Sequence, residues 1–152
     1  MTWVDTHCHL QLDDRPAAEL LARAANVDWL VVPGVDAASS AAARDLAALH
    51  PGRLEWTAGL HPHDATRWAQ EADAIGALAA EAAAVGETGL DHYWVGRMDG
   101  CADPAEQEES LRWHAGLAAE LGKCLMIHNR EADDDLMRVL DEVAGPDSGI
   151  PH

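Results

Sequence analysis

The sequence predicts an α/β fold organised around a parallel β-sheet. Five short apolar segments of β-forming character begin at residues 3, 29, 54, 83 and 125, so their starts lie 26, 25, 29 and 42 residues apart. A longer stretch of helical character follows each of them. Strands and helices that alternate at such intervals are typical of successive βαβ units. The 152 residues contain no linker, low-complexity tract or repeat, so we expect one domain over residues 1–152.

The expected strands are short, because polar or turn-forming residues bound each apolar run. They occupy residues 3–6, 29–32, 54–60, 83–86 and 125–127. The expected helices cover residues 15–25, 39–49, 69–82, 105–121 and 131–143.

We expect Pro16 in the first turn of the first helix, where its missing N–H costs nothing. The second helix follows Asp36, and the third is rich in Ala and Glu with a thin apolar face. Asp103-Pro104 opens the fourth and Gly122 closes it, and the fifth has an apolar stripe at helical spacing.

The amino-acid composition and net charge limit the classes of function that are open to this chain. Ten Lys and Arg residues against 27 Asp and Glu leave a formal charge of −17, which counts against an extended basic surface for gripping a nucleic-acid duplex. A small anion site built from metal ions remains open, because the ions set the local charge. Cys8, Cys101 and Cys124 are odd in number and share no close spacing, so we expect neither disulfides nor a CxxC motif. With no secretion signal or long apolar run, the sequence favours a cytoplasmic protein without membrane contact.

The residues with metal-binding or catalytic chemistry follow the expected strands. They are His7 and His9 after the first strand, His61 and His63 after the third, Glu87 after the fourth and His128 after the fifth. The carboxyl ends of parallel strands face the same side, so these side chains are expected to converge there.

Each motif alone allows a plainer interpretation. In extended backbone His7 and His9 point the same way, about 6.6 Å apart, and can reach one ion, with Cys8 facing away and Asp5 as an acceptor for a ligand N–H. They could equally be polar residues at a strand end. Glu87 could bind or bridge ions, or lie exposed in a Gly-rich turn.

The other strand-end residues are similarly ambiguous. His128 and Arg130 pair a neutral nitrogen ligand with a guanidinium suited to phosphate, or cap a core strand. His61 and His63 could contact substrate or make structural hydrogen bonds. We expect surface or packing roles for three further histidines and for Cys8, and a solvated helix start for residues 131–135. The three histidines are His50, His92 and His114.

Four motifs in this order resemble the TatD family of metal-dependent hydrolases. They are residues 4–10 (VDTHCHL), 59–63 (GLHPH), 85–91 (VGETGLD) and 127–130 (IHNR). The resemblance implies a (β/α)₈ TIM barrel of the metal-dependent hydrolase superfamily. It also implies two divalent ions, Zn, Mg or Mn, and hydrolysis of DNA phosphodiester bonds by an activated water. The implied partner is DNA, as single strands or ends, and no obligate protein partner is indicated.

The resemblance also assigns residues. By position it implies His7 and His9 as ligands of the first ion, catalytic Glu87 as a bridge to the second, and His128 as a ligand of the second. His152 matches a further metal-binding histidine of the family. The substrate phosphate would lie near His61, His63 and Arg130.

The resemblance stops before the family's later strands, including a strand-end aspartate that binds the first ion. A barrel takes about 200 to 250 residues. We therefore expect only the first five βα units and the start of the sixth strand, a C-terminally incomplete domain with little activity alone. Two alternatives stay open: an ester or amide hydrolase of the same superfamily, such as a D-aminoacyl-tRNA deacylase, and an inactive fragment.

Overall fold

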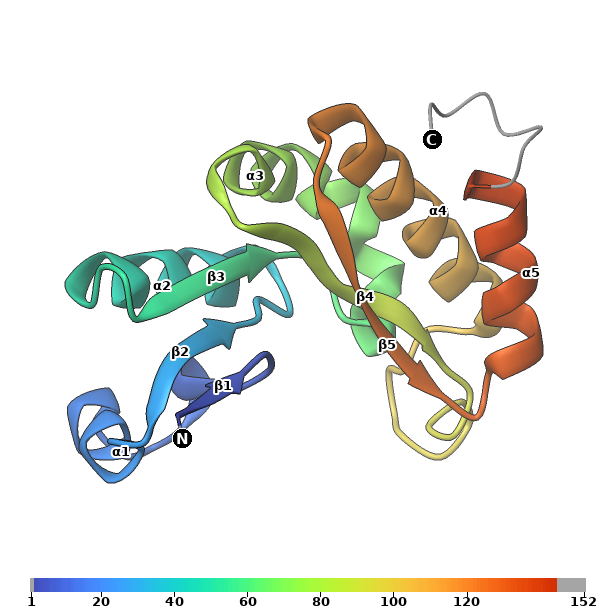
Figure 1. The fold of residues 1–152 in the computed structure, drawn as a ribbon. Helices are drawn as coiled ribbons and strands as arrows, with labels where there is room; N and C mark the ends of the chain where they lie inside the picture. The colour runs from blue at the N-terminus through green and yellow to red at the C-terminus, as the bar shows by residue number, and fades with distance from the viewer. Residues whose placement is uncertain (1, 145–152) are drawn as a thin grey trace.

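The computed structural model describes residues 2–144 and places five strands in one sheet. The strands are β1 (Trp3–Asp5), β2 (Val27–Val32), β3 (Leu54–Ala58), β4 (Ala84–Asp91) and β5 (Cys124–Arg130). All neighbours pair in parallel, in the order β1-β2-β3-β4-β5. Figure 1 shows the sheet as an open, curved arc, which is half of a barrel. The prediction of a parallel α/β fold is confirmed, and the start of the sixth strand lies outside the described residues.

Five α-helices alternate with the strands and lie along the outer side of the arc (Figure 1). They are α1 (Ala17–Arg23), α2 (Ala37–Leu49), α3 (Trp68–Glu81), α4 (Pro104–Leu121) and α5 (Asp133–Ala144). Two short 3₁₀ helices, η1 (Leu10–Leu12) and η2 (Pro62–Arg67), follow β1 and β3. Within residues 2–144 no helix is long and apolar enough to span a bilayer.

The helix ends agree with the sequence signals except at α1. Asp36 and Asp103 each cap a helix through a capping box, accepting a main-chain N–H with the side chain. Gly122 ends α4 in the left-handed conformation, with φ of 63°. Pro16 precedes α1 as its N-cap, so its placement in the first turn was wrong by one position.

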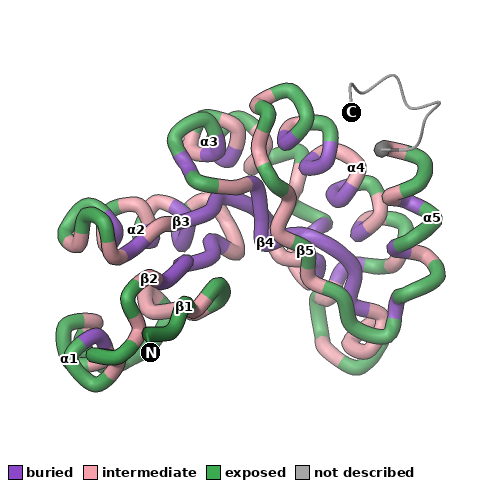
Figure 2. Tube along the Cα trace, in the orientation of Figure 1, coloured by how far each residue is buried: buried purple, intermediate pink, exposed green. Residues whose placement is uncertain are grey.

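The apolar residues form two clusters on the helix-facing side of the sheet. The larger includes Leu30, Val32, Trp56 and Val85 from the middle strands, and the smaller joins β4 to α4 and α5. Figure 2 shows burial concentrated on β3 and β4, while β1 and β5 at the edges of the arc are more exposed. The buried centre therefore carries the fourth strand, on which Glu87 lies.

The fourth and fifth strands are longer than predicted, and this changes the setting of two site residues. β4 continues to Asp91 and β5 to Arg130, so Glu87 and His128 lie on the strands and not beyond them. The glycines in residues 86–89 are the cause. A Cβ on Gly89, whose φ is 144°, would lie 2.0 Å from the main-chain oxygen of His128. The glycine lets β5 pair closely with β4 instead of ending the strand.

His114 is a buried histidine in the structural role that the sequence predicts. Its Nε2 accepts a hydrogen bond from the main-chain N–H of Leu60 at 3.1 Å, and its Nδ1 donates to the carbonyl of Ser110 at 2.8 Å. Burial lowers the pKa of His114 to about 4, although the bond to Ser110 opposes the shift. A proton on Nε2 would also face the Leu60 N–H.

This histidine should make the metal-free protein sensitive to mild acid. Between pH 6.5 and 4, His114 is protonated in the unfolded chain but stays neutral in the folded protein. The free energy of unfolding therefore decreases as the pH falls through this range. From pH 7 to pH 5 the free energy of unfolding should drop by about 2 kcal/mol more in the wild-type chain than in His114→Gln. Urea denaturation at the two pH values measures this difference, and equal drops would contradict it.

Candidate metal centre

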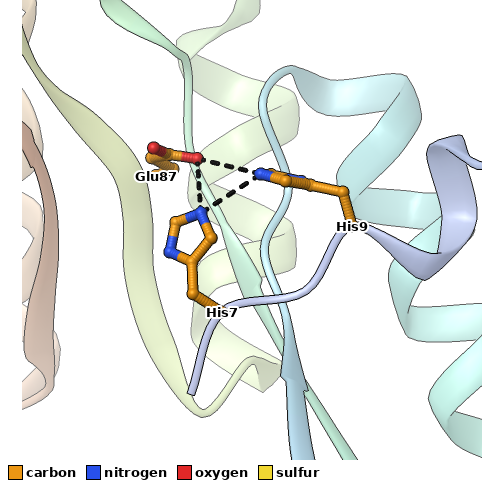
Figure 3. Close-up of side chains that lie close together, drawn as sticks. All are labelled: His7, His9 and Glu87. Atoms are coloured by element: carbon orange, nitrogen blue, oxygen red, sulfur yellow. Dashed lines mark hydrogen bonds and ion pairs between the residues drawn. The ribbon is translucent and has the colours of Figure 1, made fainter. Parts of the chain in front are cut away.

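The first group of ligand atoms joins the end of β1 to the middle of β4. His7 Nε2 and His9 Nε2 lie 3.1 Å apart, and Glu87 Oε2 lies 3.2 Å and 3.3 Å from them. Figure 3 shows both imidazoles pointing at the carboxylate. Tetrahedral zinc at its usual bond lengths would hold ligand atoms about 3.3 Å apart. Glu87 Oε2 is buried, yet it has no well-aligned hydrogen bond within the described part of the chain. These residues therefore fit a metal ion.

The second group uses the other oxygen of the same carboxylate. Glu87 Oε1 lies 3.0 Å from His128 Nδ1, and His61 Nε2 lies 3.3 Å from that same nitrogen. The ligand atoms of His61, Glu87 and His128 are close enough together to hold one ion. Glu87, only 4% exposed, thus faces one group of nitrogens with each oxygen. This arrangement is compatible with the bridging role that the family resemblance implies for Glu87, and it adds His61 as a possible donor.

Asp91, for which no role is predicted from the sequence, organises the second group. Its Oδ2 lies 2.9 Å from both His63 Nε2 and His128 Nε2. If His128 donates from Nε2, its Nδ1 keeps a lone pair toward Glu87 and His61, as in carboxylate–histidine–metal triads. Asp91 is 1% exposed, and its main-chain N–H donates to Gln107 at 2.7 Å. His63 is therefore bound to this carboxylate while also lining the cavity.

The charges in the site suit a cation. Burial alone would raise the pKa of Glu87, but in the metal-free chain the close imidazoles of His128, His9 and His7 hold it well below its usual range. Burial, with the nearby charges of His128 and His63, lowers the pKa of His61 to about 4. At neutral pH the site therefore offers an ionised carboxylate and a neutral imidazole at His61.

The groups open into one cavity of about 420 Å³ at the carboxyl ends of the strands. Its walls include His9, His61, His63, Glu87 and His128. The structure thus brings together strand-end residues that are far apart in the sequence. It does not place Arg130 among the ligand atoms, because its guanidinium lies over Tyr93, 4.0 Å from the ring centroid. His152 lies outside the described residues.

Two minor predictions have different outcomes. Cys8 donates from its thiol to the carbonyl of Val31 at 3.4 Å, and burial raises its pKa to about 11, so the packing role is confirmed. Asp5 was expected to accept a ring N–H of a metal ligand. It accepts the main-chain N–H of His7 instead, at 3.0 Å, because the chain turns immediately after β1.

The half-barrel and its histidine–carboxylate groups resemble the fold and the ligand pattern of the metal-dependent hydrolases. The family profile described as TatD related DNase matches residues 4–152, and the chain belongs to this family.

Curated relatives agree with the family match. The chain is 41% identical, over 98% of its length and 60% of the relative, to an uncharacterized metal-dependent hydrolase TatD of Mycobacterium tuberculosis. It is 38% identical, over 78% of its length and 45% of the relative, to a protein of Edwardsiella piscicida named 3'-5' ssDNA/RNA exonuclease TatD. The chain spans about half the length of the curated relatives it matches.

Solved structures agree on the fold. A TatD family hydrolase of Entamoeba histolytica superposes with a TM-score of 0.78 at 18% identity, covering 95% of this chain and 55% of the other. A TatD homologue of Escherichia coli K12 gives a TM-score of 0.72 at 26% identity, covering 95% of this chain and 57% of the other. The half-barrel described above is therefore the fold seen in part of these proteins.

Proposed function

We propose that this chain carries the metal- and phosphate-binding part of a metal-dependent nuclease that hydrolyses phosphodiester bonds in DNA, as single strands or at ends. The observation that carries the proposal is the Glu87 carboxylate, whose two oxygens each face a separate group of imidazole nitrogens. Two such groups around one carboxylate suit a pair of divalent ions, and Zn, Mg and Mn are all candidates. The name of the Edwardsiella piscicida relative, a single-stranded DNA/RNA exonuclease, supports a nuclease, and the name of the Mycobacterium tuberculosis relative supports a metal-dependent hydrolase.

The proposed roles follow the contacts. His7, His9 and catalytic Glu87 would hold the first ion, and Glu87 with His128 would hold the second, with His61 within reach. When bound, such ions lower the pKa of water and neutralise charge on a phosphate. Asp91 keeps the lone pair of His128 Nδ1 turned toward Glu87. His63, on the cavity wall, and Arg130 are proposed to bind phosphate groups of the substrate, and His152 is proposed as a further ligand.

Two further proposals concern the chain as a whole. We propose that residues 1–152 form one domain of the TatD type, because the two apolar clusters share Leu125 and no linker separates them. We also propose a cytoplasmic location, since Cys8, Cys101 and Cys124 are all free thiols.

The function is tested by fusing this chain to the part of the Mycobacterium tuberculosis relative that it does not match. The fusion should hydrolyse single-stranded DNA with Mn²⁺ or Mg²⁺, a chelator should abolish the hydrolysis, and His7→Ala with His9→Ala should reduce it at least about 100-fold. The unfused chain should show far less turnover. Faster hydrolysis of an ester than of a phosphodiester under the same conditions, or activity that survives metal removal, would refute the proposal.

A further inference from the structure

A stack of cations and aromatic rings lies on the loop after β4. The guanidinium carbons of Arg97 and Arg130 lie 4.5 Å and 4.0 Å from the centroid of the Tyr93 ring. Arg130 also lies over the ring of Trp94 at 5.6 Å, and the two aromatic rings meet edge to face. One tyrosine thus gathers two positive charges, through cation–π contacts of the kind Arg favours.

Positively charged side chains are few in this chain, and most of them are already engaged by other groups. Five arginines contact carboxylates, namely Arg15, Arg44, Arg67, Arg112 and Arg138. Arg53 and Lys123 donate to main-chain carbonyls. Within residues 2–144, four arginines have no carboxylate at ion-pair distance, namely Arg23, Arg53, Arg97 and Arg130. Two of these four arginines, Arg97 and Arg130, meet at Tyr93, and no carboxylate neutralises their charge there.

The stack is fixed to the metal centre through Asp91. While Asp91 Oδ2 contacts the two site histidines, its Oδ1 accepts the main-chain N–H of Trp94 at 3.2 Å. Arg130 pairs with Asp91 across β4 and β5, and it follows His128 by two residues, which puts both side chains on the same face of the sheet.

Hydrogen bonds within the loop hold Arg97 beside the same ring. Its guanidinium donates to the carbonyl of Tyr93 at 2.9 Å, and its main-chain N–H donates to the carbonyl of Trp94 at 3.0 Å. The ring of Trp94 lies 6.4 Å from that of His63, which lines the cavity. The ring of Trp94 therefore connects Tyr93, which holds both guanidinium groups, to the wall of the cavity.

We propose that Arg97 and Arg130, held on Tyr93, bind a second phosphate of the substrate, next to the one at the metal centre. This inference rests on the proposed function and deepens it, because it names the substrate as a nucleotide chain with several phosphates and not an isolated phosphodiester or a neutral ester. A guanidinium stacked on a ring keeps N–H donors at its edge, and these suit a phosphate. The family resemblance implies a phosphate contact for Arg130, together with His61 and His63, and implies none for Arg97.

Anisotropy of a fluorescein-labelled, single-stranded ten-thymidine oligonucleotide tests the site in the 152-residue chain without divalent ions. Arg97→Ala should weaken binding about 10-fold at low salt and reduce the slope of log affinity against log salt by about 0.7. Arg23→Ala is the matched control, because it removes the same charge from α1 at the other end of the arc (Figure 1). Tyr93→Phe keeps the aromatic ring and should bind the oligonucleotide with wild-type affinity. Tyr93→Leu removes the ring and should weaken binding as much as Arg97→Ala does.

A second probe isolates the phosphate. With an uncharged methylphosphonate oligonucleotide, the wild-type chain and Arg97→Ala should bind alike. Equal effects of Arg97→Ala and Arg23→Ala on the charged oligonucleotide, or no binding by the wild type, would overturn the inference. Hydrolysis by the fusion is measured separately. If the fusion hydrolyses DNA but Arg97→Ala binds the oligonucleotide no more weakly than Arg23→Ala, only this inference is refuted. If Arg97→Ala specifically weakens binding but the fusion does not hydrolyse DNA, only the proposed function is refuted.

Discussion

Replacing Glu87 by glutamine should remove tight divalent-metal binding from both histidine groups at once. Each oxygen of this carboxylate faces one group, at 3.2 Å and 3.3 Å from His7 and His9 and at 3.0 Å from His128. Glutamine removes the negative charge, and its amide nitrogen has no lone pair for a metal. We expect the affinity for Zn²⁺ or Mn²⁺ to fall at least about 100-fold at each site, because even outer partners of metal ligands contribute 10- to 100-fold. Isothermal titration calorimetry of the 152-residue chain measures both sites.

Two variants control this result. Glu81→Gln makes the same chemical change at an exposed position at the end of α3, and should leave both sites intact. His7→Ala should weaken only the group at the end of β1. A Glu87→Gln chain that still bound two ions with wild-type affinity would exclude Glu87 as a bridge.

The fold could be predicted to the level of elements because its signals are local. Apolar runs alternate with helix-forming stretches, and capping residues such as Asp36 and Asp103 mark where helices begin. The lengths of β4 and β5 could not be predicted in the same way. From the sequence, Gly89 indicates the end of a strand. Its reason is the close approach of the His128 main chain, and that approach is a tertiary contact.

The site was predictable where one strand end supplies its residues. His7 and His9 are two residues apart, and this spacing alone brings their nitrogens together. Asp91 was missed because its partners come from elsewhere, His63 from η2 and His128 from β5. A signal was present nonetheless: Asp91 and Glu87 are four residues apart on one strand, so both face the same side.

Asp91→Asn should weaken metal binding at only one of the two groups. Asp91 Oδ2 contacts His63 and His128, and its Oδ1 accepts the N–H of Trp94. Asparagine has only one oxygen, so its NH₂ must face either the Trp94 N–H or an imidazole N–H. When the oxygen keeps the bond to the Trp94 N–H, the NH₂ faces the imidazoles, and His128 loses the acceptor that keeps its Nδ1 lone pair toward Glu87. We expect a loss of about 10- to 100-fold in metal affinity for the group of His128, with the group of His7 unchanged.

Calorimetry gives the two affinities, and ¹⁵N NMR of the imidazoles reports the tautomer of His128. Asp99→Asn is the matched control, since Asp99 is exposed on the same loop and has no ion pair among residues 2–144. Equal losses at both groups would mean that Asp91 supports the fold of the whole sheet rather than one ligand. A loss confined to the His128 group, with a shifted tautomer population, would show that a buried carboxylate on β4 positions the ligand on β5. The function of Asp91 would then depend on the close β4–β5 pairing that Gly89 permits.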